Sequence, residues 1–469
     1  MTKNAKKFFL DEHGCAKNQV DGEIIISNLI RAGYERAERI EDADFIVINS
    51  CGFIESAKKE SLDALVGARK NFPTKKIIFA GCLAQRYSEV FKTELPEADG
   101  IFGNGDLSLI SDLAKKVLQG KRAVLAPEQA GVNCGERLAN LSYENSVYVK
   151  ITEGCSNHCA FCAIPLIRGE LRSRPSKDVI AEIESLLHRG VFEINLVGQD
   201  LAAYGTEENF VRENGEKKSP LYSLLKKISA LKGNFWVRLL YIHPDHFPLD
   251  ILELFKKDSR LLAYFDIPFQ SGDDGIIRAM NRKCTQSAYI ELVNKIRTAL
   301  PHAAIRTTFL AGFPGEDENA FLNTLDFLKK IRADWAGAFC FSKEDGTPAA
   351  KMKNPVPKKV AAARQKILIE AQEEITAENL SRRVKNENAE NLEYEILIEE
   401  VFLEKEGAGG EAFAIGRAWF EAPDVDGNFV VRFDSDDENA LALVKPGKVV
   451  RAKAVGVNGV DIDSVLLGK

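Results

Sequence analysis

Short apolar runs alternate with amphipathic segments along residues 8–341 of the chain. In the first 120 residues the runs at 8–10, 45–48 and 76–80 predict strands, and the patterns at 20–32, 55–70 and 107–118 predict helices. Strands that are separated by helices form parallel sheets covered by those helices. The sequence therefore predicts an N-terminal α/β domain with a parallel sheet over residues 1–120.

The alternation resumes in longer units after residues 121–145, a stretch whose Pro127, Gly131 and Gly135 indicate a linker. Six further strands are expected at 147–151, 193–197, 235–240, 264–267, 304–310 and 335–341. Six parallel strands with crossover helices curve into an open barrel, two strands short of the eight that close a full one. We expect this βα barrel, with a long trailing helix over Lys358–Val384, to occupy residues 146–385.

Residues 386–469 have a different character. Short strands are expected at 394–399, 412–416, 429–433 and 449–455, a pattern typical of a small all-β barrel. This segment contains 18 Asp and Glu against 8 Lys and Arg, a net charge of −10, whereas the whole chain carries −6. Asp434, Asp436, Asp437 and Glu438 lie close together within it. The last segment is therefore expected to be acidic.

The apolar runs are strand-sized, well short of the roughly 20 residues that a membrane span needs. The first residues also lack the apolar core of a secretory signal. We therefore expect a soluble cytoplasmic protein that has no membrane partner. In that reducing compartment its nine cysteines favour metal binding or catalysis over disulfides.

The strongest local motif is the C-x3-C-x2-C triplet of Cys155, Cys159 and Cys162, which follows the first expected barrel strand. Three thiolates on one loop can reach a single metal centre, and three rather than four leave one iron of a [4Fe–4S] cluster open. The carboxyl end of a barrel strand is also where such folds place their chemistry. The alternative is a zinc loop that His158 or a distant residue completes.

A second set is dispersed along the N-terminal domain. Cys15, Cys51 and Cys82 each follow an expected strand. Because the carboxyl ends of parallel strands lie along one edge of a sheet, these three thiols can converge on a second site with one open position. The alternative is three ordinary buried thiols. The remaining cysteines, and the histidines at 188, 243, 246 and 302, fit no such pattern and are expected to have no catalytic role.

Three further stretches accompany the cysteines: Arg168–Pro175, Ile267–Gly272 and Thr308–Glu316. Together these motifs resemble those of the methylthiotransferases of the radical S-adenosylmethionine (SAM) superfamily, and the resemblance covers essentially the whole chain. It implies that the three segments are a methylthiotransferase domain, a radical SAM barrel and a TRAM domain.

The resemblance also implies the cofactors. Cys155, Cys159 and Cys162 would hold a [4Fe–4S] cluster that binds SAM and cleaves it to a radical. Cys15, Cys51 and Cys82 would hold a second [4Fe–4S] cluster that carries sulfur, and a second SAM would supply the methyl group. SAM contacts are expected from polar and glycine residues after the barrel strands: Gly198, Gln199, Gln270, Ser271, Gly272, Gly312 and Gly315.

Within the family, three places resemble the branch that modifies an aspartate of a ribosomal protein. Lys17 and Asp200 stand where the tRNA-modifying relatives tend to have Met and Asn, and Ala422–Gly427 has that branch's form. Gly22, where the family often has Ser, departs from the pattern at a position that is not a ligand. The β-carbon of aspartate carries hydrogens too weakly acidic for a protein base, so a cofactor must perform this step.

The implied partner is a basic protein of the small ribosomal subunit, the one at the decoding centre. The electron donor and the sulfur source stay unidentified. Two alternatives remain open: a tRNA methylthiotransferase with the same chemistry, and a non-catalytic RNA-binding module stabilised by structural metal.

Overall fold

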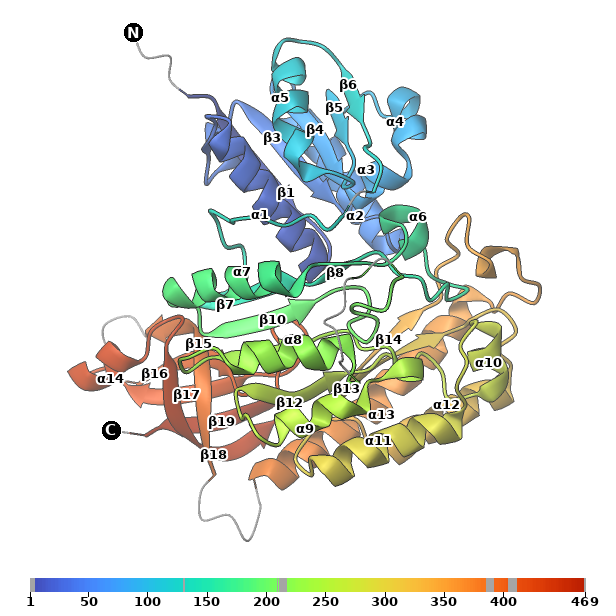
Figure 1. Cartoon of the computed structure of the whole chain (residues 1–469), viewed down its shortest axis with the longest axis vertical. Helices are drawn as coiled ribbons and strands as arrows, with labels where there is room; N and C mark the ends of the chain where they lie inside the picture. The colour runs from blue at the N-terminus through green and yellow to red at the C-terminus, as the bar shows by residue number, and fades with distance from the viewer. Residues whose placement is uncertain are drawn as a thin grey trace.

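The computed structural model describes residues 5–129, 131–208, 210, 217–384, 392–403 and 411–467. An N-terminal α/β domain lies above a central barrel, and a small β-barrel packs at the base of that barrel (Figure 1). No helix in these ranges is long and apolar enough to cross a membrane. The fold class predicted from the sequence is confirmed.

The N-terminal sheet is parallel throughout, in the order β2-β1-β3-β4-β5-β6. Its strands are β1 Lys7–Glu12, β2 Glu35–Arg36, β3 Phe45–Ser50, β4 Lys76–Gly81, β5 Gly100–Phe102 and β6 Ala123–Leu125. Its helices are α1 Ala16–Arg31, α2 Glu55–Asn71, α3 Cys82–Arg86, α4 Ser88–Glu94 and α5 Ile110–Leu118. Helices α1 and α5 cover one face and α2, α3 and α4 the other, so every residue of β3 is buried.

The stretch 121–145, expected to be a linker, begins with a strand. β6 pairs in parallel with β5, through Gly100 with Ala123 and Phe102 with Leu125. Neither strand was expected, because three residues are too few to show a period. The pairing partner rather than the local sequence makes them strands. The sheet therefore extends past residue 120.

The central sheet has the order β14-β13-β12-β11-β10-β7, with every neighbouring pair parallel, and forms the open six-stranded barrel that the sequence predicts. Its strands are β7 Ser146–Lys150, β10 Glu193–Val197, β11 Trp236–Leu239, β12 Leu261–Asp266, β13 Ala304–Ala311 and β14 Trp335–Cys340. The surrounding helices are α7 Ser176–His188, α8 Pro220–Ser229, α9 Leu252–Phe255, α10 Asp274–Ala279, α11 Gln286–Ala299, α12 Glu318–Ile331 and α13 Lys358–Val384.

A small hairpin and a short helix stand at the mouth of the barrel. The hairpin pairs β8 Thr152–Glu153 with β9 Arg172–Ser173, and helix α6 Ile164–Arg168 lies between these strands in the sequence. Short 3₁₀ helices occupy Ile40–Asp42, Leu107–Leu109, Pro244–His246, Leu249–Ile251 and Ala349–Lys351.

The C-terminal domain is a closed barrel in the order β15-β16-β17-β19-β18. Its elements are β15 Glu393–Leu403, β16 Glu411–Arg417, β17 Phe429–Asp434, α14 Glu438–Leu443, β18 Val449–Asn458 and β19 Asp461–Leu466. β19 was not expected from the sequence, since its polar residues weaken the apolar signal, and the barrel closes only through it. The expected boundary between residues 385 and 386 lies outside the described residues.

A buried ionic contact joins this domain to the base of the central barrel. Glu193 of β10, which is fully buried, pairs with Arg238 at 2.9 Å and with Arg417 of the C-terminal domain at 2.7 Å. Tyr264 of β12 donates a hydrogen bond to Asp426 at 2.6 Å. Burying charges in this way requires good pairing, so the contact fixes the two domains in one arrangement.

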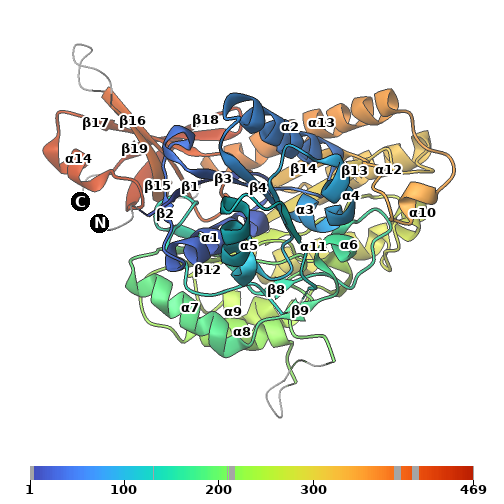
Figure 2. The ribbon, with the colours of Figure 1, turned by 90° about the horizontal axis from the view of Figure 1, so that it is seen from above.

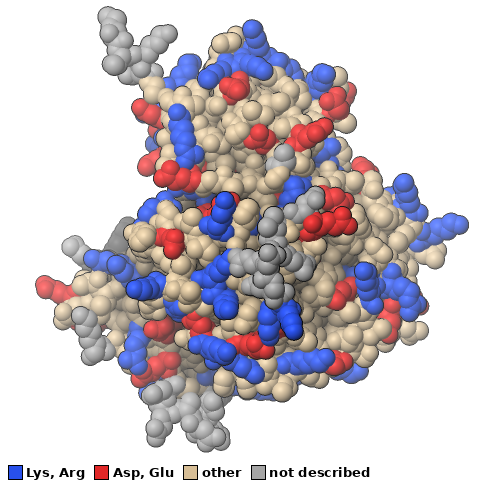
Figure 3. Space-filling model, viewed as in Figure 1, with Lys and Arg blue, Asp and Glu red and all other residues tan. Residues whose placement is uncertain are grey.

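This interface buries some of the acidic residues of the C-terminal domain. Glu399 and Glu421 are buried in it, and the Asp426 side chain is fully covered, so the −10 charge overstates the acidity of the surface. Asp434 and the run from Asp436 to Glu438 do remain exposed. Figure 3 shows acidic side chains at the end of the molecule that holds α14, and basic ones over α7 and α8.

Candidate active site

The three N-terminal cysteines stand at the carboxyl ends of three neighbouring strands. Cys15 precedes α1 after β1, Cys51 follows β3, and Cys82 begins α3 directly after β4. Two glycines show how closely these loops approach. A Cβ on Gly14 would lie 3.0 Å from the Cβ of Cys51, and one on Gly52 would lie 2.9 Å from the backbone of Cys82. The parallel sheet thus gathers the three loops at one edge.

Hydrogen-bond donors surround the buried sulfur of Cys82. The Arg168 guanidinium donates to Cys82 Sγ at 3.0 Å and the Asn104 amide donates at 3.4 Å. Burial nevertheless raises the pKa of Cys82 to about 11, and burial raises the pKa of Cys51 to about 12. A metal that binds these sulfurs must therefore displace their protons. Donors aimed at the sulfur suit a bound thiolate, which accepts hydrogen bonds strongly.

The second set of cysteines lies on one loop that the backbone of the mouth supports. Cys155 N–H donates to the Gly169 carbonyl at 3.0 Å, and Cys162 N–H donates to the Cys159 carbonyl at 3.0 Å. Gly154 has φ +73°, and a Cβ there would lie 2.0 Å from a backbone carbonyl oxygen, so only glycine fits this turn. Burial raises the pKa of Cys155 to about 11 and that of Cys162 to about 12.

A buried aspartate and two histidines pack beside this loop. Asp200 accepts hydrogen bonds from Asn157 of the loop at 2.8 Å and from His246 at 2.7 Å. His243 places its Nε2 3.8 Å from Cys159 Sγ, and burial lowers the pKa of His243 to about 3, so this imidazole is neutral. Neither histidine was expected to have a role. Their place just after β11, at the same edge as the other strand ends, was the available signal.

Four buried charges connect the two cysteine regions. Arg168, the last residue of α6, pairs with Glu153 at 2.5 Å and with Asp21 of α1 at 2.8 Å. Lys150 at the end of β7 pairs with Asp21 as well, and with Glu153 at 2.7 Å. All four side chains are at most 2% exposed. Burial raises the pKa of Glu153, but the two cations outweigh it and bring that pKa to about 2. The network links the N-terminal domain to the barrel.

Apolar packing brings the two sets of cysteines to a common interface. Cys82 packs with Ala163 and Ile167, and Ala163 directly follows Cys162. Seen from above, α3 lies beside α6, which belongs to the barrel (Figure 2). Cys82 and the C-x3-C-x2-C loop therefore face each other across the interface between the domains.

The composition of both sites suits iron–sulfur clusters. Each site offers three sulfur ligands, which leaves a fourth position for another molecule. All nine cysteines are free thiols. Within the described residues, no three His, Cys, Asp or Glu side chains surround a single metal ion. A cubane cluster attaches each thiolate to a different iron atom, so its ligands stand farther apart than those of one ion.

The residues expected to bind SAM divide into two groups. Gly198 and Gln199 follow β10 at the mouth, where Gln199 donates to Glu153 at 3.4 Å. Gln270 follows β12 with φ +70°, a left-handed conformation that few residues other than glycine adopt. These three lie at the strand ends that face the cysteines.

The others pack against helices. Ser271 shares a hydrogen bond with Thr324 of α12 at 3.1 Å, and a Cβ on Gly272 would lie 2.3 Å from Phe327. A Cβ on Gly312 would lie 2.4 Å from the Cβ of Ala361 of α13. Close packing therefore favours glycine at positions 272 and 312. Gly315 has φ +88° and open space beside it.

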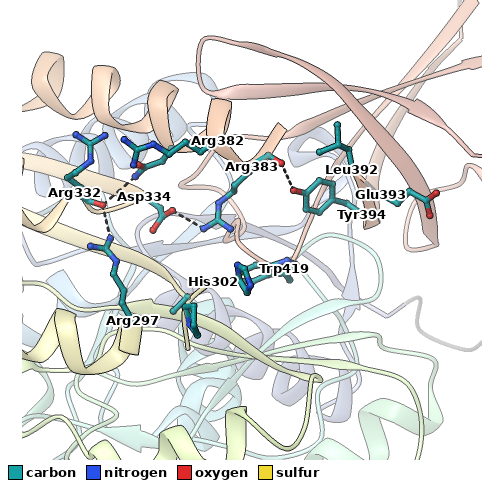
Figure 4. A pocket seen from close by; sticks show the side chains of 13 residues that line it. Arg297, His302, Arg332, Asp334, Arg382, Arg383, Leu392, Glu393, Tyr394 and Trp419 are labelled. Atoms are coloured by element: carbon teal, nitrogen blue, oxygen red, sulfur yellow. Dashed lines mark hydrogen bonds and ion pairs between the residues drawn. The ribbon is translucent and has the colours of Figure 1, made fainter. Parts of the chain in front are cut away.

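A separate cavity of about 700 Å³ lies at the opposite end of the barrel, between α13 and the start of β15 (Figure 4). Several arginines line this cavity, and their guanidinium groups already form hydrogen bonds or ion pairs within the protein. Arg297 donates to the Arg332 carbonyl at 2.8 Å, and Arg383 pairs with Asp334 at 2.8 Å. This cavity adjoins the strands' amino ends, away from the cysteines.

Models of three protein families match the chain in succession. They are the uncharacterized protein family UPF0004 over residues 7–103, the radical SAM superfamily over residues 149–328 and the TRAM domain over residues 392–466. The cysteine sets fall in the first and the second of these regions.

Relatives match along nearly the whole length. A protein of Treponema denticola named ribosomal protein uS12 methylthiotransferase RimO is 46% identical, over 97% of this chain and 100% of that protein. The chain belongs to the RimO family. A RimO protein of Carboxydothermus hydrogenoformans is 37% identical, over 90% of this chain and 92% of that protein.

Solved structures give a more distant likeness. The radical SAM methyltransferase TsrM of Kitasatospora setae, solved with cobalamin and a [4Fe–4S] cluster, matches with a TM-score of 0.51 and 15% identity. The match covers 74% of this chain and 77% of TsrM. At this identity the likeness concerns the fold, and it confirms the radical SAM architecture.

Proposed function

We propose that this chain methylthiolates the ribosomal protein uS12, replacing a hydrogen on the β-carbon of an aspartate with a methylthio group. The observation that carries the proposal is the meeting of two three-cysteine sets at one interface, where Cys82 packs on the residue that follows Cys162. The kinship with RimO proteins over the whole length supports it.

Each cysteine set would hold one [4Fe–4S] cluster. Cys155, Cys159 and Cys162 would bind the cluster at which SAM is cleaved, and the remaining set, Cys15, Cys51 and Cys82, would bind the other. When bound, these groups supply a radical that abstracts hydrogen from an unactivated carbon, together with the sulfur and the methyl group. SAM would lie among the strand ends of the mouth, near residues of the expected set Gly198, Gln199, Gln270, Ser271, Gly272, Gly312 and Gly315.

The protein's own residues exclude water and orient the groups. The ion network of Arg168, Glu153, Asp21 and Lys150 seals one side of the interface, because none of its members is more than 2% exposed. A closed site protects a radical from side reactions with solvent. We propose that the reaction takes place in the cytoplasm, where ribosomal proteins are assembled, with an electron donor and a sulfur source that stay unidentified.

The decisive experiment is a competition. Reconstituted protein, SAM and a reductant are incubated without oxygen with uS12 and tRNA together, and both products are analysed by mass spectrometry. We expect a mass gain of one methylthio group on an aspartate of uS12 and unmodified tRNA. Methylthio-adenosine in tRNA, with uS12 untouched, would assign the chain to the tRNA-modifying relatives. About eight irons per chain, rather than zinc, would exclude a structural metal-stabilised module.

A further inference from the structure

Lys17 presents an unusual charge at the interface between the two cysteine sets. It is the second residue of α1 and is only 9% exposed. Its ammonium lies 3.4 Å from the centre of the Tyr241 ring, in a cation–π contact. Within the described residues, no carboxylate lies within salt-bridge distance of the Lys17 ammonium. Two other buried cations of this interface, Lys150 and Arg168, each pair with carboxylates.

A buried ammonium without an anion costs free energy, because an aromatic ring only partly replaces the lost hydration. The network one turn further along α1 shows the usual solution, since Asp21 there is paired with two cations. Lys17 is also buried, but no carboxylate of the described residues forms an ion pair with it. Its surroundings are Cys15, Tyr241, Arg168 and the more distant Asp266, and Asp266 is itself paired with Arg306 at 3.4 Å. The Cys15 sulfur, when it is a thiolate, is an anionic neighbour, but no described carboxylate pairs with the ammonium. A carboxylate from a second molecule would complete the site.

The position of Lys17 indicates where that anion would stand. Lys17 is two residues from Cys15 of the first cysteine set. Its partner Tyr241 follows β11 and is two residues from His243, which touches Cys159 of the second set. Tyr241 adopts the left-handed conformation with φ +68°, which turns the chain at the mouth of the barrel. The Lys17–Tyr241 contact therefore connects the chain segments that carry the two sets.

We infer that Lys17 binds the side-chain carboxylate of the substrate aspartate. This inference rests on the proposed function and adds a specificity-determining residue to it. A carboxylate held by the Lys17 ammonium places the adjacent β-carbon between the two cysteine sets, where hydrogen is removed and sulfur is added. An asparagine at the same position of uS12 would leave the buried charge unpaired, so the site selects the acid over its amide.

The test measures binding without turnover. After mass spectrometry has located the modified aspartate, uS12 and its Asp→Asn variant are titrated against the reconstituted enzyme without reductant. The unsubstituted enzyme should bind the aspartate form about 30-fold more tightly, as expected for a buried charge pair. Lys17→Met should bind both forms equally, and Lys17→Arg should retain much of the preference. Lys17→Gln repeats the test should the Met variant fold poorly.

Two controls separate this role from a structural one. Lys115→Met removes an exposed ammonium from the same domain and should keep the full preference. Iron content and the spectrum of the N-terminal cluster are measured in each variant. A Lys17→Met enzyme that still prefers the aspartate form, or that loses iron and weakens both forms by the same factor, would overturn the inference. If the unsubstituted enzyme neither binds nor modifies uS12, the proposed function itself fails.

Discussion

The two cysteine sets each lie at the carboxyl edge of a parallel sheet, one in the N-terminal domain and one in the central barrel, but they are assembled in different ways. Cys155, Cys159 and Cys162 lie on a single loop, so local spacing alone reveals them. Cys15, Cys51 and Cys82 come together only because β1, β3 and β4 are neighbours in the sheet. The first set can be found as a motif, whereas the second requires a topology. A dispersed site is therefore sensitive to the fold of the whole domain.

The environments of the sets differ as well. Cys82 receives a hydrogen bond from a guanidinium, whereas Cys159 lies near a neutral imidazole. Hydrogen bonds to cluster sulfurs and nearby positive charge raise the reduction potential of an iron–sulfur cluster. We therefore expect the hydrogen bond from Arg168 to raise the reduction potential of a cluster held at the N-terminal site.

The largest effect is expected from the loop set. Cys155→Ala should abolish SAM cleavage and all methylthiolation, because the cluster that binds SAM loses a ligand. Iron at the N-terminal site should survive, at about four irons per chain in place of about eight. The measurements are 5′-deoxyadenosine by chromatography and iron by chemical assay. Normal 5′-deoxyadenosine formation in this variant would contradict the assignment of the loop.

The reciprocal variant tests the dispersed set. Cys51→Ala should lose about half of the iron and all methylthiolation, but SAM cleavage should remain measurable, since the loop is intact. The same two assays apply, with mass spectrometry of uS12 added. A variant with full iron and full activity would mean that the three N-terminal cysteines are ordinary buried thiols.

The contrast between the sets also explains what the sequence could predict. Six barrel strands were expected within a few residues of their observed bounds, because each is a buried apolar run between amphipathic helices. The short strands β5 and β6 were missed, since tertiary pairing rather than composition creates them. β19 was missed for a similar reason, because it alternates Asp and Ser with apolar residues.

In the candidate site, too, features of the local sequence could be predicted, whereas tertiary contacts could not. Both cysteine sets were expected as cluster sites, which stays a prediction, and in the structure Cys82 packs beside the loop that carries the second set. The contacts that join them, such as Arg168 with Cys82, were not expected, since a charged residue gives no sign in the sequence of what it meets across a domain boundary. The composition also overstated the negative charge on the surface of the C-terminal domain, because acidic residues such as Glu421 are buried.

An effect of intermediate size is expected from Arg168, which contacts Cys82 and the ion network between the two domains. Arg168→Met leaves Asp21 and Glu153 with Lys150 alone, and removing one member of a buried ionic network costs about 3–5 kcal/mol. The first thermal unfolding transition should therefore move to lower temperature. Loss of the donor to Cys82 should also lower the reduction potential of the N-terminal cluster, followed by electron paramagnetic resonance during a redox titration.

Arg137→Met is the matched control for this variant. Arg137 is similarly buried and also bridges the domains, with Glu23 of α1 at 2.6 Å and Glu182 of α7 at 2.8 Å. Among the described residues it donates no hydrogen bond to a cysteine. The Arg137→Met variant should lower the free energy of unfolding by a similar amount and leave the reduction potentials of both clusters unchanged. A shift of equal size in the two variants would show that domain docking, rather than the contact with the sulfur, sets the potential.

The smallest effect is expected far from both sets, on the exposed acidic surface of the C-terminal domain. Ribosomal proteins are generally basic because they bind RNA, so opposite charge can speed their encounter with the enzyme. The triple variant of Asp434, Asp436 and Asp437 to Asn should slow association with uS12 by about threefold to tenfold at low salt and leave kcat unchanged. Asn is the appropriate replacement, because Asp437 caps α14 and Asn caps helices equally well.

The control is a triple variant with the same change of charge at a different place, Glu370, Glu373 and Glu374 to Gln, on the exposed side of α13. Association rates are measured by stopped flow over a range of salt concentrations. The Asp variant should reduce the salt dependence and the Glu variant should leave it close to that of the unsubstituted protein, because screening acts over about 10 Å at 0.1 M salt. Equal rates in all three proteins would mean that the acidic surface does not guide uS12, and that recognition lies wholly at the interface of the two cysteine sets.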